Sequence, residues 1–328
     1  MYNYCTLFDS YYLSRGLAMY ESLKKNSDSF HLYIFAFDVK SYNVLIKLNL
    51  DSATIISLAQ FEDNELLNVK DSRTSAEYCW TSTSSTILYV LENFNVDSCT
   101  YIDADIYFYA SPKAIFDEMG HNSILITEHR YSNQYSYELP ISGRYCVQFV
   151  TFKNDERALK ALRWWRARCL EWCYNRNEDG KFGDQLYLED WTERFEGVHV
   201  LQHLGGGLAP WNIQQYSFII NNDKIEGHEI ETGRNFQPIF YHFHFLRYYT
   251  NGQIELGDRK ISKLVQNIFY RPYINLLEKI KYKINEIDNS FDPNGASKKN
   301  YRFKAPLTYL KRKTIGSHNI YNLKKFMN

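Results

Sequence analysis

The chain has 328 residues, of which 45% are apolar and 17% aromatic, and its formal net charge is zero. This length and composition favour one large α/β domain with an appendage, or two small domains. The charge is uneven, because residues 298–328 contain nine Lys or Arg and no Asp or Glu. A nucleic-acid-binding domain would carry the positive charge on its folded body, so we exclude nucleic acid as a partner.

The N-terminus has no basic stretch followed by an apolar segment, and no apolar run approaches the length of a membrane span. We therefore expect neither a signal peptide nor a transmembrane helix. The six cysteines form no CxxC pair and no Cys/His cluster, which excludes a zinc site. Free thiols of this kind are typical of a reducing cytoplasm, where we place the protein.

Strands and helices alternate in the first hundred residues. Apolar runs predict strands at 2–8, 30–37 and 53–58, with a helix from Asp9-Ser10 to about Lys25 after the first strand. The run at 30–37 is apolar throughout, as in a parallel strand buried on both faces. This alternation predicts a parallel sheet with helices on both faces.

The remainder of the chain continues the pattern, with polar loops between the elements. We predict helices at 76–93, 154–174, 184–193 and 259–288, and strands at 99–102, 106–109, 123–128, 145–152, 216–220 and 236–243. The predicted fold is α/β, with a mixed, mostly parallel sheet flanked by helices. We divide the chain into a catalytic domain at 1–255, a C-terminal helix at 256–290 and a basic aromatic tail at 291–328.

Asp103 and Asp105 follow the apolar strand that ends at Ile102. Such a pair lies at the carboxyl edge of a parallel sheet, where open α/β folds bind ligands. Two carboxylates so close repel each other, and a divalent cation relieves the repulsion. Oxygen ligands suit Mg²⁺ or Mn²⁺, and such an ion stabilises the charge of a departing diphosphate. The alternative is a pair of loop aspartates that cap a helix.

Two other enzyme classes use a similar acidic motif. A haloacid-dehalogenase-like phosphatase has it near the N-terminus, whereas here it stands 103 residues into the chain. A nucleotidylyltransferase needs a glycine-rich, basic phosphate loop after its first strand. The first glycine here is Gly16, so both classes are disfavoured.

Four stretches together resemble a GT-A-fold glycosyltransferase, closest to the retaining family 8 enzymes and related bacterial sugar transferases. They are Thr6–Leu23, Tyr101–Ile106, Gly183-Asp184-Gln185 and Tyr241-His242-Phe243-His244. They span about residues 1–250 in the order of the family. The resemblance implies transfer of a sugar from a nucleotide diphosphate sugar, here UDP-sugar, in bacterial surface polysaccharide or lipopolysaccharide synthesis.

The resemblance implies that Asp103 and Asp105 hold Mn²⁺ or Mg²⁺ and that a later histidine completes the metal shell. His242 and His244 are both candidates, because they fall on the same side of a strand. We favour His242 slightly, since it follows an apolar run. The family often has Gly and then Lys-Pro-Trp after this histidine, where this chain has Phe245-Leu246-Arg247. Arg247 would replace the lysine that contacts the diphosphate.

The resemblance also implies which residues contact the donor sugar. Asp184 would bind sugar hydroxyls and Gln185 would lie below the anomeric carbon, which implies retention of configuration. An alternative reading of Asp184 is a helix N-cap. Ala104 would contact the donor, and Gln148 would serve where relatives have Asn-x-Gly.

The first loop is the candidate for the nucleotide. Thr6 and Phe8 end the first strand, Asp9 would accept a hydrogen bond from a base, and Tyr11 would stack on it. Asp38 and Arg73 complete the predicted donor contacts, with ordinary turn chemistry as the alternative. Glu128-His129-Arg130 ends a strand and would point into the acceptor cleft, and Trp211 would floor an acceptor sugar. The aromatic and apolar residues of the tail would face a membrane surface; they are Tyr301, Phe303, Tyr309, Leu310 and Phe326.

The basic tail predicts attachment to an anionic membrane surface, where lipid-linked acceptors lie, with a solvated chain end as the alternative. The sequence therefore predicts a metal-dependent glycosyltransferase that acts on a glycan or lipid-linked acceptor, in the cytoplasm and peripherally at the inner membrane face. The competing hypotheses are a non-catalytic GT-A-like protein that binds a nucleotide or glycan, and a sugar-phosphate nucleotidylyltransferase.

Overall fold

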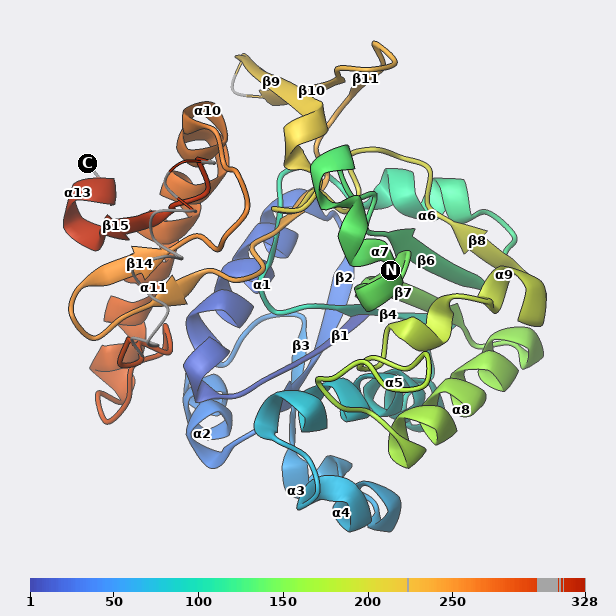
Figure 1. Ribbon diagram of the computed structural model, residues 1–328. Coiled ribbons are helices and arrows are strands. Elements are labelled where there is room, and N and C mark those ends of the chain that lie inside the picture. The colour runs from blue at the N-terminus through green and yellow to red at the C-terminus, as the bar shows by residue number, and fades with distance from the viewer. Residues whose placement is uncertain (223, 300–311, 313, 315, 328) are drawn as a thin grey trace.

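A seven-stranded sheet forms the centre of the molecule, with the strand order β3-β2-β1-β4-β7-β6-β8 (Figure 1). The computed structural model describes residues 1–222, 224–299, 312, 314 and 316–327. β7 runs antiparallel to β4 and β6, and the other neighbouring pairs are parallel, which confirms the predicted mixed sheet. The strands are β1 (Tyr2–Phe8), β2 (Phe30–Ala36), β3 (Ala53–Ser57), β4 (Ser98–Ile102), β6 (Ile124–Glu128), β7 (Tyr145–Lys153) and β8 (Val198–Val200).

Helices cover both faces of this sheet. Side chains alternate along β1, so that Tyr4 and Phe8 pack into one hydrophobic core while Cys5 and Leu7 pack into the other. The first core includes α1 (Leu13–Asn26), α2 (Val39–Leu48), α6 (Lys113–Met119) and α11 (Arg271–Ile287). The second includes α3 (Leu58–Phe61), α4 (Asn64–Lys70), α5 (Ser75–Asn93), α8 (Glu156–Glu171) and α9 (Trp191–Arg194).

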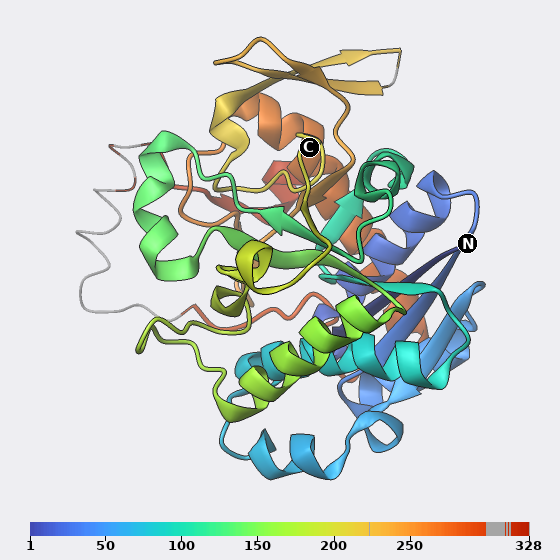
Figure 2. The ribbon, with the colours of Figure 1, turned by 90° about the vertical axis from the view of Figure 1, so that its right-hand side faces the viewer.

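Within the described ranges, three smaller sheets accompany the central one, and two of them come from the middle of the chain. β5 (Ile106–Phe108) pairs with β12 (Phe240–His242), and this pairing carries a late segment of the chain to the end of β4. β9 (Tyr216–Asn221), β10 (Lys224–Glu229) and β11 (Asn235–Phe236) form an arm that projects from the body (Figure 2). Sequence analysis missed β10 because its residues are largely polar. It also merged β11 with β12, which Pro238 separates because proline cannot donate to a ladder.

The predicted helix at 184–193 is wrong. The chain forms a 3-10 turn at Leu186–Leu188 and then the short α9, with Asp190 in a non-helical conformation between them. The predicted helix at 259–288 is shorter than expected and compound. Ser262 caps α10 (Lys263–Val265), a π-helical stretch follows at Gln266–Tyr270, and α11 then ends at Ile287.

The described part of the C-terminal tail packs on the body. β15 (Ile320–Asn322) pairs with β14 (Gln253–Glu255), which pairs with β13 (Arg247–Tyr248), and α13 (Leu323–Met327) follows. Phe326 is buried in the core that includes α11. The other four predicted membrane-facing residues, Tyr301, Phe303, Tyr309 and Leu310, lie outside the described residues. None of the helices in the described ranges has the length and apolar character needed to cross a membrane.

Candidate active site

A cleft of about 590 Å³ opens at the carboxyl edge of the central sheet. The ends of β1 and β4 and the start of β7 form its floor, and one face of α5 forms a wall. Two later segments, 182–185 and 242–245, complete the lining. Ligands bind at this edge in open α/β folds, so the cleft has the expected position for an active site.

The pairing of β5 with β12 brings Asp103 and Asp105 close to His242 and His244. Asp103 and Asp105 form a tight turn after β4, in which the Ile106 N–H donates to the Asp103 carbonyl at 3.2 Å. β5 then pairs with β12 in a register that sets His242 opposite Ile106. The Phe243 N–H donates to the Asp105 carbonyl at 2.9 Å, which extends the contact by one residue. The pairing therefore places two segments, distant in sequence, side by side at the sheet edge.

Three side chains converge there with the geometry of a cation site. Asp105, His242 and His244 each offer one ligand atom, and these atoms lie within 4.8 Å of one another. His242 Nε2 is 3.1 Å from Asp105 Oδ1 and 3.6 Å from Asp103 Oδ2. The two histidines that sequence analysis could not separate thus lie in the same cluster. Carboxylate oxygens with imidazole nitrogens are a ligand set that divalent metals accept.

Neighbouring side chains orient these ligands. His242 Nδ1 lies 2.8 Å from Gln148 Oε1, and an amide oxygen is only an acceptor, so Nδ1 carries the proton and Nε2 faces the carboxylates. The Tyr101 hydroxyl donates to Asp103 Oδ1 at 2.9 Å. Partners of this kind fix the tautomer and ring orientation of a metal-binding histidine. Gln148, predicted to contact the donor, is fully buried beside His242.

The pKa values of the acidic and histidine side chains in this cluster are shifted far from their ordinary values. Burial, reinforced by Asp105, raises the pKa of Asp103 to about 7. Burial acts in the same direction on Asp105, but the adjacent His242 outweighs it and lowers the pKa of Asp105 to about 2. Burial and the neighbouring His242 lower the pKa of His244 to about 3. Perturbed titratable groups gathered in a cleft are a mark of functional sites.

Asp184 and Gln185 also line this cleft. Burial and the charge of Asp103 raise the pKa of Asp184 to about 8. The Trp165 indole N–H donates to the Asp184 carbonyl at 2.9 Å, and the Gln185 amide donates to the Ser142 carbonyl at 2.7 Å. Asp184 is not a helix N-cap, because the turn that follows begins after Gln185 and has no side-chain cap. Its carboxyl group instead pairs with the Thr83 side chain, which also lines the cleft.

Two curated proteins of Bacillus subtilis strain 168 are similar to this chain over most of its length. YfnD is 31% identical over 299 residues, which are 88% of this chain and 92% of YfnD. YfnF is 33% identical over 247 residues, which are 73% of this chain and 80% of YfnF. This chain belongs to their family. No model of a known protein family matches it.

Solved structures of glycosyltransferases share the fold. Galactosyltransferase LgtC, in complex with donor and acceptor sugar analogs, aligns with a TM-score of 0.50 and 10% identity over 84% of this chain and 95% of its own. The bifunctional glycosyltransferase WbbM aligns with a TM-score of 0.51 and 11% identity over 88% of this chain and 52% of its own. The chain therefore has the GT-A-like fold that sequence analysis predicted.

The structure brings ten of the predicted site residues to the cleft. They are Phe8, Asp9, Asp103, Ala104, Asp105, Gln148, Asp184, Gln185, His242 and His244. Tyr12 lines the cleft, whereas Tyr11, which we expected to stack on the base, is 57% exposed outside it. Asp9 accepts hydrogen bonds from the backbone N–H groups of both tyrosines, and this turn sets which ring faces inward.

Four further predicted residues do not line the cleft. Thr6 is fully buried within the sheet. Asp38 caps α2, accepting from the Ser41 N–H at 2.7 Å. The Arg73 guanidinium stacks at 3.9 Å from the Tyr174 ring centroid and donates to a backbone carbonyl. Arg247 is exposed in β13, with its guanidinium 5.7 Å from the Phe245 ring centroid.

Sequence analysis missed the wall that α5 forms. Ala76, Cys79, Trp80 and Thr83 line the cleft, at the three- and four-residue spacing of one helix face. That spacing was visible in the sequence, but the direction of the face depends on how α5 packs on β1 and β4. His129 and Trp211, which we expected on the acceptor side, also line the cleft. Cleft residues that the sequence did not suggest include Tyr131, Glu138, Cys146, Phe245 and Arg259.

Proposed function

We propose that the protein transfers a sugar from UDP-sugar to a hydroxyl of a glycan or lipid-linked acceptor, in a reaction that needs Mn²⁺ or Mg²⁺. The observation that carries this proposal is the convergence of Asp103, Asp105, His242 and His244 in a cleft that Asp184 also lines. A cation site beside a buried carboxyl group suits a diphosphate next to a sugar. The cleft volume of about 590 Å³ falls in the range of small-molecule sites.

The cation would be held by Asp105, His242 and His244, with Asp103 beside them. A mixed set of carboxylates and imidazoles favours Mn²⁺ over Mg²⁺, which prefers oxygen ligands. When bound, such an ion stabilises the negative charge that develops on the departing diphosphate. Gln148 keeps His242 Nε2 directed toward the carboxylates.

The other side chains of the cleft would position the two substrates. Asp184 would accept hydrogen bonds from the donor sugar hydroxyls, and Gln185 would lie near the anomeric carbon, which favours retention. Tyr131, Trp211 and Phe245 offer aromatic faces on which an acceptor sugar could pack. Phe245 has a backbone φ of 66°, rare for a bulky residue, and is 41% exposed. Strain of this kind persists where the surrounding structure enforces it, often at functional sites.

A panel of nucleotide sugars, incubated with and without Mn²⁺ and candidate acceptors, tests the proposal. We expect metal-dependent release of UDP that is lost in Asp105→Ala, and a product whose anomeric configuration matches that of the donor. Thermal stabilisation by UDP with no turnover on any acceptor would instead indicate a non-catalytic binding protein. Pyrophosphate from UTP and a sugar phosphate would indicate a nucleotidylyltransferase.

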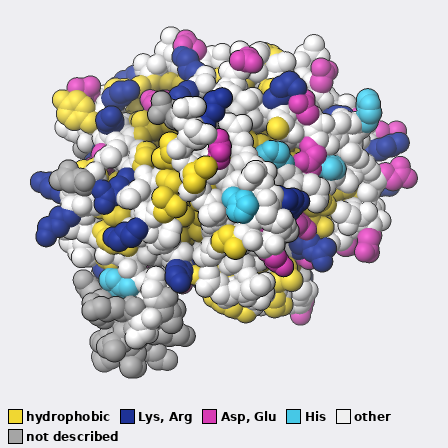
Figure 3. Space-filling view, turned by 90° about the horizontal axis from the view of Figure 1, so that it is seen from above, with side chains coloured by type: hydrophobic (Ala, Val, Ile, Leu, Met, Phe, Trp, Pro, Cys, Tyr) yellow, Lys and Arg dark blue, Asp and Glu magenta, His cyan; other side chains and the backbone are white. Residues whose placement is uncertain are grey.

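The acceptor would be carried at an anionic membrane surface, at the inner face of a bacterial cell membrane, in surface polysaccharide synthesis. In Figure 3, Lys and Arg side chains are denser on the side of the C-terminal elements than on the other side. Each such side chain near an anionic surface contributes about 1 kcal/mol. Replacement of Lys298, Lys324 and Lys325 by Gln should weaken binding to anionic vesicles, and unchanged binding would contradict this attachment. Truncation is unsuitable, because Phe326 is buried in the core.

A further inference from the structure

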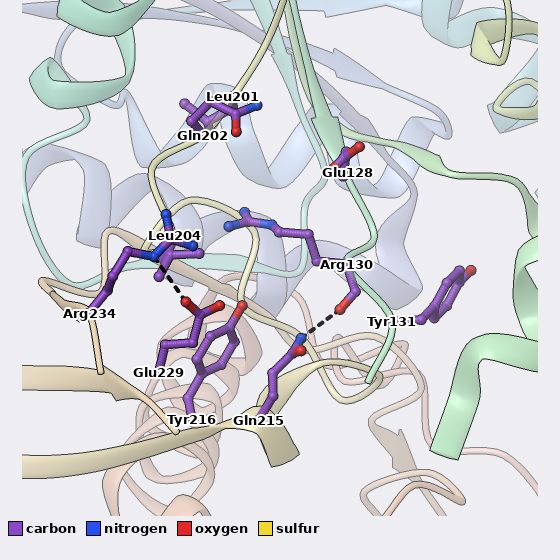
Figure 4. Close-up of a pocket in the computed structure, with 10 residues that line it drawn as sticks. All are labelled: Glu128, Arg130, Tyr131, Leu201, Gln202, Leu204, Gln215, Tyr216, Glu229 and Arg234. Atoms are coloured by element: carbon purple, nitrogen blue, oxygen red, sulfur yellow. Dashed lines mark hydrogen bonds and ion pairs between the residues drawn. The ribbon is translucent and has the colours of Figure 1, made fainter. Parts of the chain in front are cut away.

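A second cavity, of about 230 Å³, adjoins the active-site cleft at Tyr131, and Figure 4 shows the residues that line it. The chain that continues from β6 separates the two, and its side chains alternate between them. His129 faces the cleft, Glu128 and Arg130 line the second cavity, and Tyr131 borders both. The remaining walls come from the loop after β8 (Leu201, Gln202, Leu204) and from the projecting arm (Gln215, Tyr216, Glu229, Arg234).

Arg130 is the unusual residue of this cavity. Its backbone has a φ of 48°, which is uncommon for a residue other than glycine. In Figure 4 its side chain extends away from Tyr131 and toward the loop and Arg234. The guanidinium donates to the backbone carbonyls of His203 and Gly206, and its Nε has no hydrogen-bond partner. Among the described residues, no carboxylate forms an ion pair with it. A largely buried guanidinium with no carboxylate in contact is costly, and the charges of Glu128 and Glu229 in the lining offset this cost only in part, so the cavity can accept an anion.

The rest of the lining suits a sugar ring. Arg234 offers a second guanidinium, which the Glu229 carboxylate now holds at 3.0 Å. Carboxylates and amides at the rim can accept hydrogen bonds from sugar hydroxyls, and Leu201 and Leu204 offer an apolar surface to the C–H face of a ring. The volume is below the range of drug-sized ligands, which points to one sugar unit.

We propose that this cavity binds one acidic sugar unit, whose carboxylate or phosphate group pairs with Arg130 and Arg234. Glu128 accepts hydrogen bonds from its hydroxyls, and Glu229 gives up its hold on Arg234 to the anion. The unit comes either from a glycan chain or from a free sugar acid or sugar phosphate, which share this chemistry. The site is separate from the proposed donor site and does not depend on transfer activity.

The glycine-rich loop between the two cavities is consistent with this arrangement. Gly207 has a φ of 99°, and a Cβ there would lie 3.0 Å from Gln148 Nε2 and 3.2 Å from an Arg130 guanidinium nitrogen. At Gly205 a Cβ would lie 1.9 Å from the Gln237 carbonyl oxygen. Of the loop's glycines, only Gly207 faces both Arg130 and Gln148, and a side chain there would be crowded by their ends and strained by the positive φ. The loop keeps the anion site one loop away from the predicted metal ligands.

Calorimetric titration of the full chain, with a chelator present, tests the proposal. Glucuronate and glucose 1-phosphate should bind at one site per chain, at least about tenfold more tightly than glucose or inorganic phosphate, because a guanidinium–anion pair adds to the sugar contacts. The same affinities in Asp105→Ala would locate binding outside the proposed donor site. A disaccharide ending in glucuronate distinguishes the sources: tighter binding than the monosaccharide indicates a glycan unit, and equal or weaker binding a free sugar.

Two substitutions with opposite expected effects on the affinity for glucuronate locate the site. Arg234→Gln should weaken binding of glucuronate about tenfold, since it removes one of the two cations. Glu229→Gln should tighten it about threefold, because it removes the carboxylate that competes for Arg234. Arg163→Gln, which removes an exposed arginine of α8, is the matched control and should have no effect. Arg130 itself is left in place because its bonds to two backbone carbonyls hold the loop.

Four results would overturn the proposal. They are absence of binding by both acidic sugars at millimolar concentration, equal binding of glucose and glucuronate, phosphate binding as tight as that of the acidic sugars, and glucuronate affinity unchanged in both Arg234→Gln and Glu229→Gln. The third result would leave a bare anion site without sugar recognition.

Discussion

Two pairs of aspartates stand at the carboxyl edge of the sheet, and the fold uses them differently. Asp9 and Asp38 follow β1 and β2, whereas Asp103 and Asp105 follow β4. The Asp38 carboxylate accepts from the backbone N–H groups of Ser10 and Ser41, at 2.9 and 2.7 Å. The Asp9 carboxylate likewise accepts from two N–H groups of the turn after β1.

In the described part of the chain, the carboxylates of Asp103 and Asp105 interact with side chains and not with backbone N–H groups. Asp103 accepts from the Tyr101 hydroxyl, and Asp105 lies 3.1 Å from His242 Nε2. A carboxylate that caps a turn is committed to the fold, because its removal leaves N–H groups without a partner. A carboxylate that faces a titratable group in a cleft is free to exchange that partner for a cation. The difference distinguishes two aspartates held by backbone N–H groups from the two that we propose bind the cation.

The largest expected effect on turnover comes from removing the charge of one aspartate in each pair and comparing the two variants. Asp105→Asn should lower UDP release by about a thousandfold, the scale of losing one strong electrostatic interaction at a reacting group. Asp38→Asn keeps a side chain that caps helices as well as Asp does, so its turnover should stay near that of the wild type. Initial rates at saturating Mn²⁺ measure both. Equal losses in the two variants would remove the distinction between the pairs.

A smaller effect should follow from loss of the amide that orients His242. Gln148→Leu removes the acceptor of the Nδ1 proton, and we expect Mn²⁺ affinity to fall about 10- to 100-fold, as for other partners of metal-binding histidines. Gln148→Glu retains an oxygen acceptor and should recover part of the affinity. Titration of UDP release with Mn²⁺ gives both values. A Leu variant with the affinity of the wild type would show that His242 does not depend on Gln148.

The Asp38 cap should affect stability rather than binding. Asp38→Ala leaves the first N–H groups of α2 without their side-chain acceptor and should lower the free energy of unfolding by about 1 kcal/mol. Urea denaturation measures this change, and the affinity for UDP should be the same as in the wild type. A loss of UDP affinity without loss of stability would return Asp38 to the donor site, where sequence analysis placed it.

The smallest expected effect is the pH dependence of the stabilisation that the Asp38 cap provides. Burial opposes the shift, but the hydrogen bonds from Ser10 and Ser41 hold the pKa of Asp38 below its ordinary value. The unfolded chain therefore binds this proton more readily, so the stabilisation is present above the unfolded pKa and is lost as pH falls through the folded one. The stability gap between wild type and Asp38→Ala should narrow as pH falls below about 4. A gap that stays constant would contradict the shift.

The sequence was sufficient for the parts of the fold that depend on local pattern. Apolar runs and caps located β1, β2, α1 and α5 because burial on a sheet or a helix face imposes a period. The Asp103–Asp105 pair was found because it follows a strand directly. The wall formed by Trp80 and the inward turn of Tyr12 were missed, because both depend on tertiary packing. At Asp38 the sequence could not distinguish a cap from a ligand contact, because the two have the same local sequence.

The most direct test of the difference between the two aspartate pairs is the amount of Mn²⁺ bound per chain, measured by electron paramagnetic resonance in the presence of UDP. The wild type and Asp38→Asn should each bind about one Mn²⁺, and Asp105→Asn and His242→Ala should bind it much more weakly. Binding in Asp105→Asn with the affinity of the wild type would contradict the assignment of this corner of the cleft as the metal site.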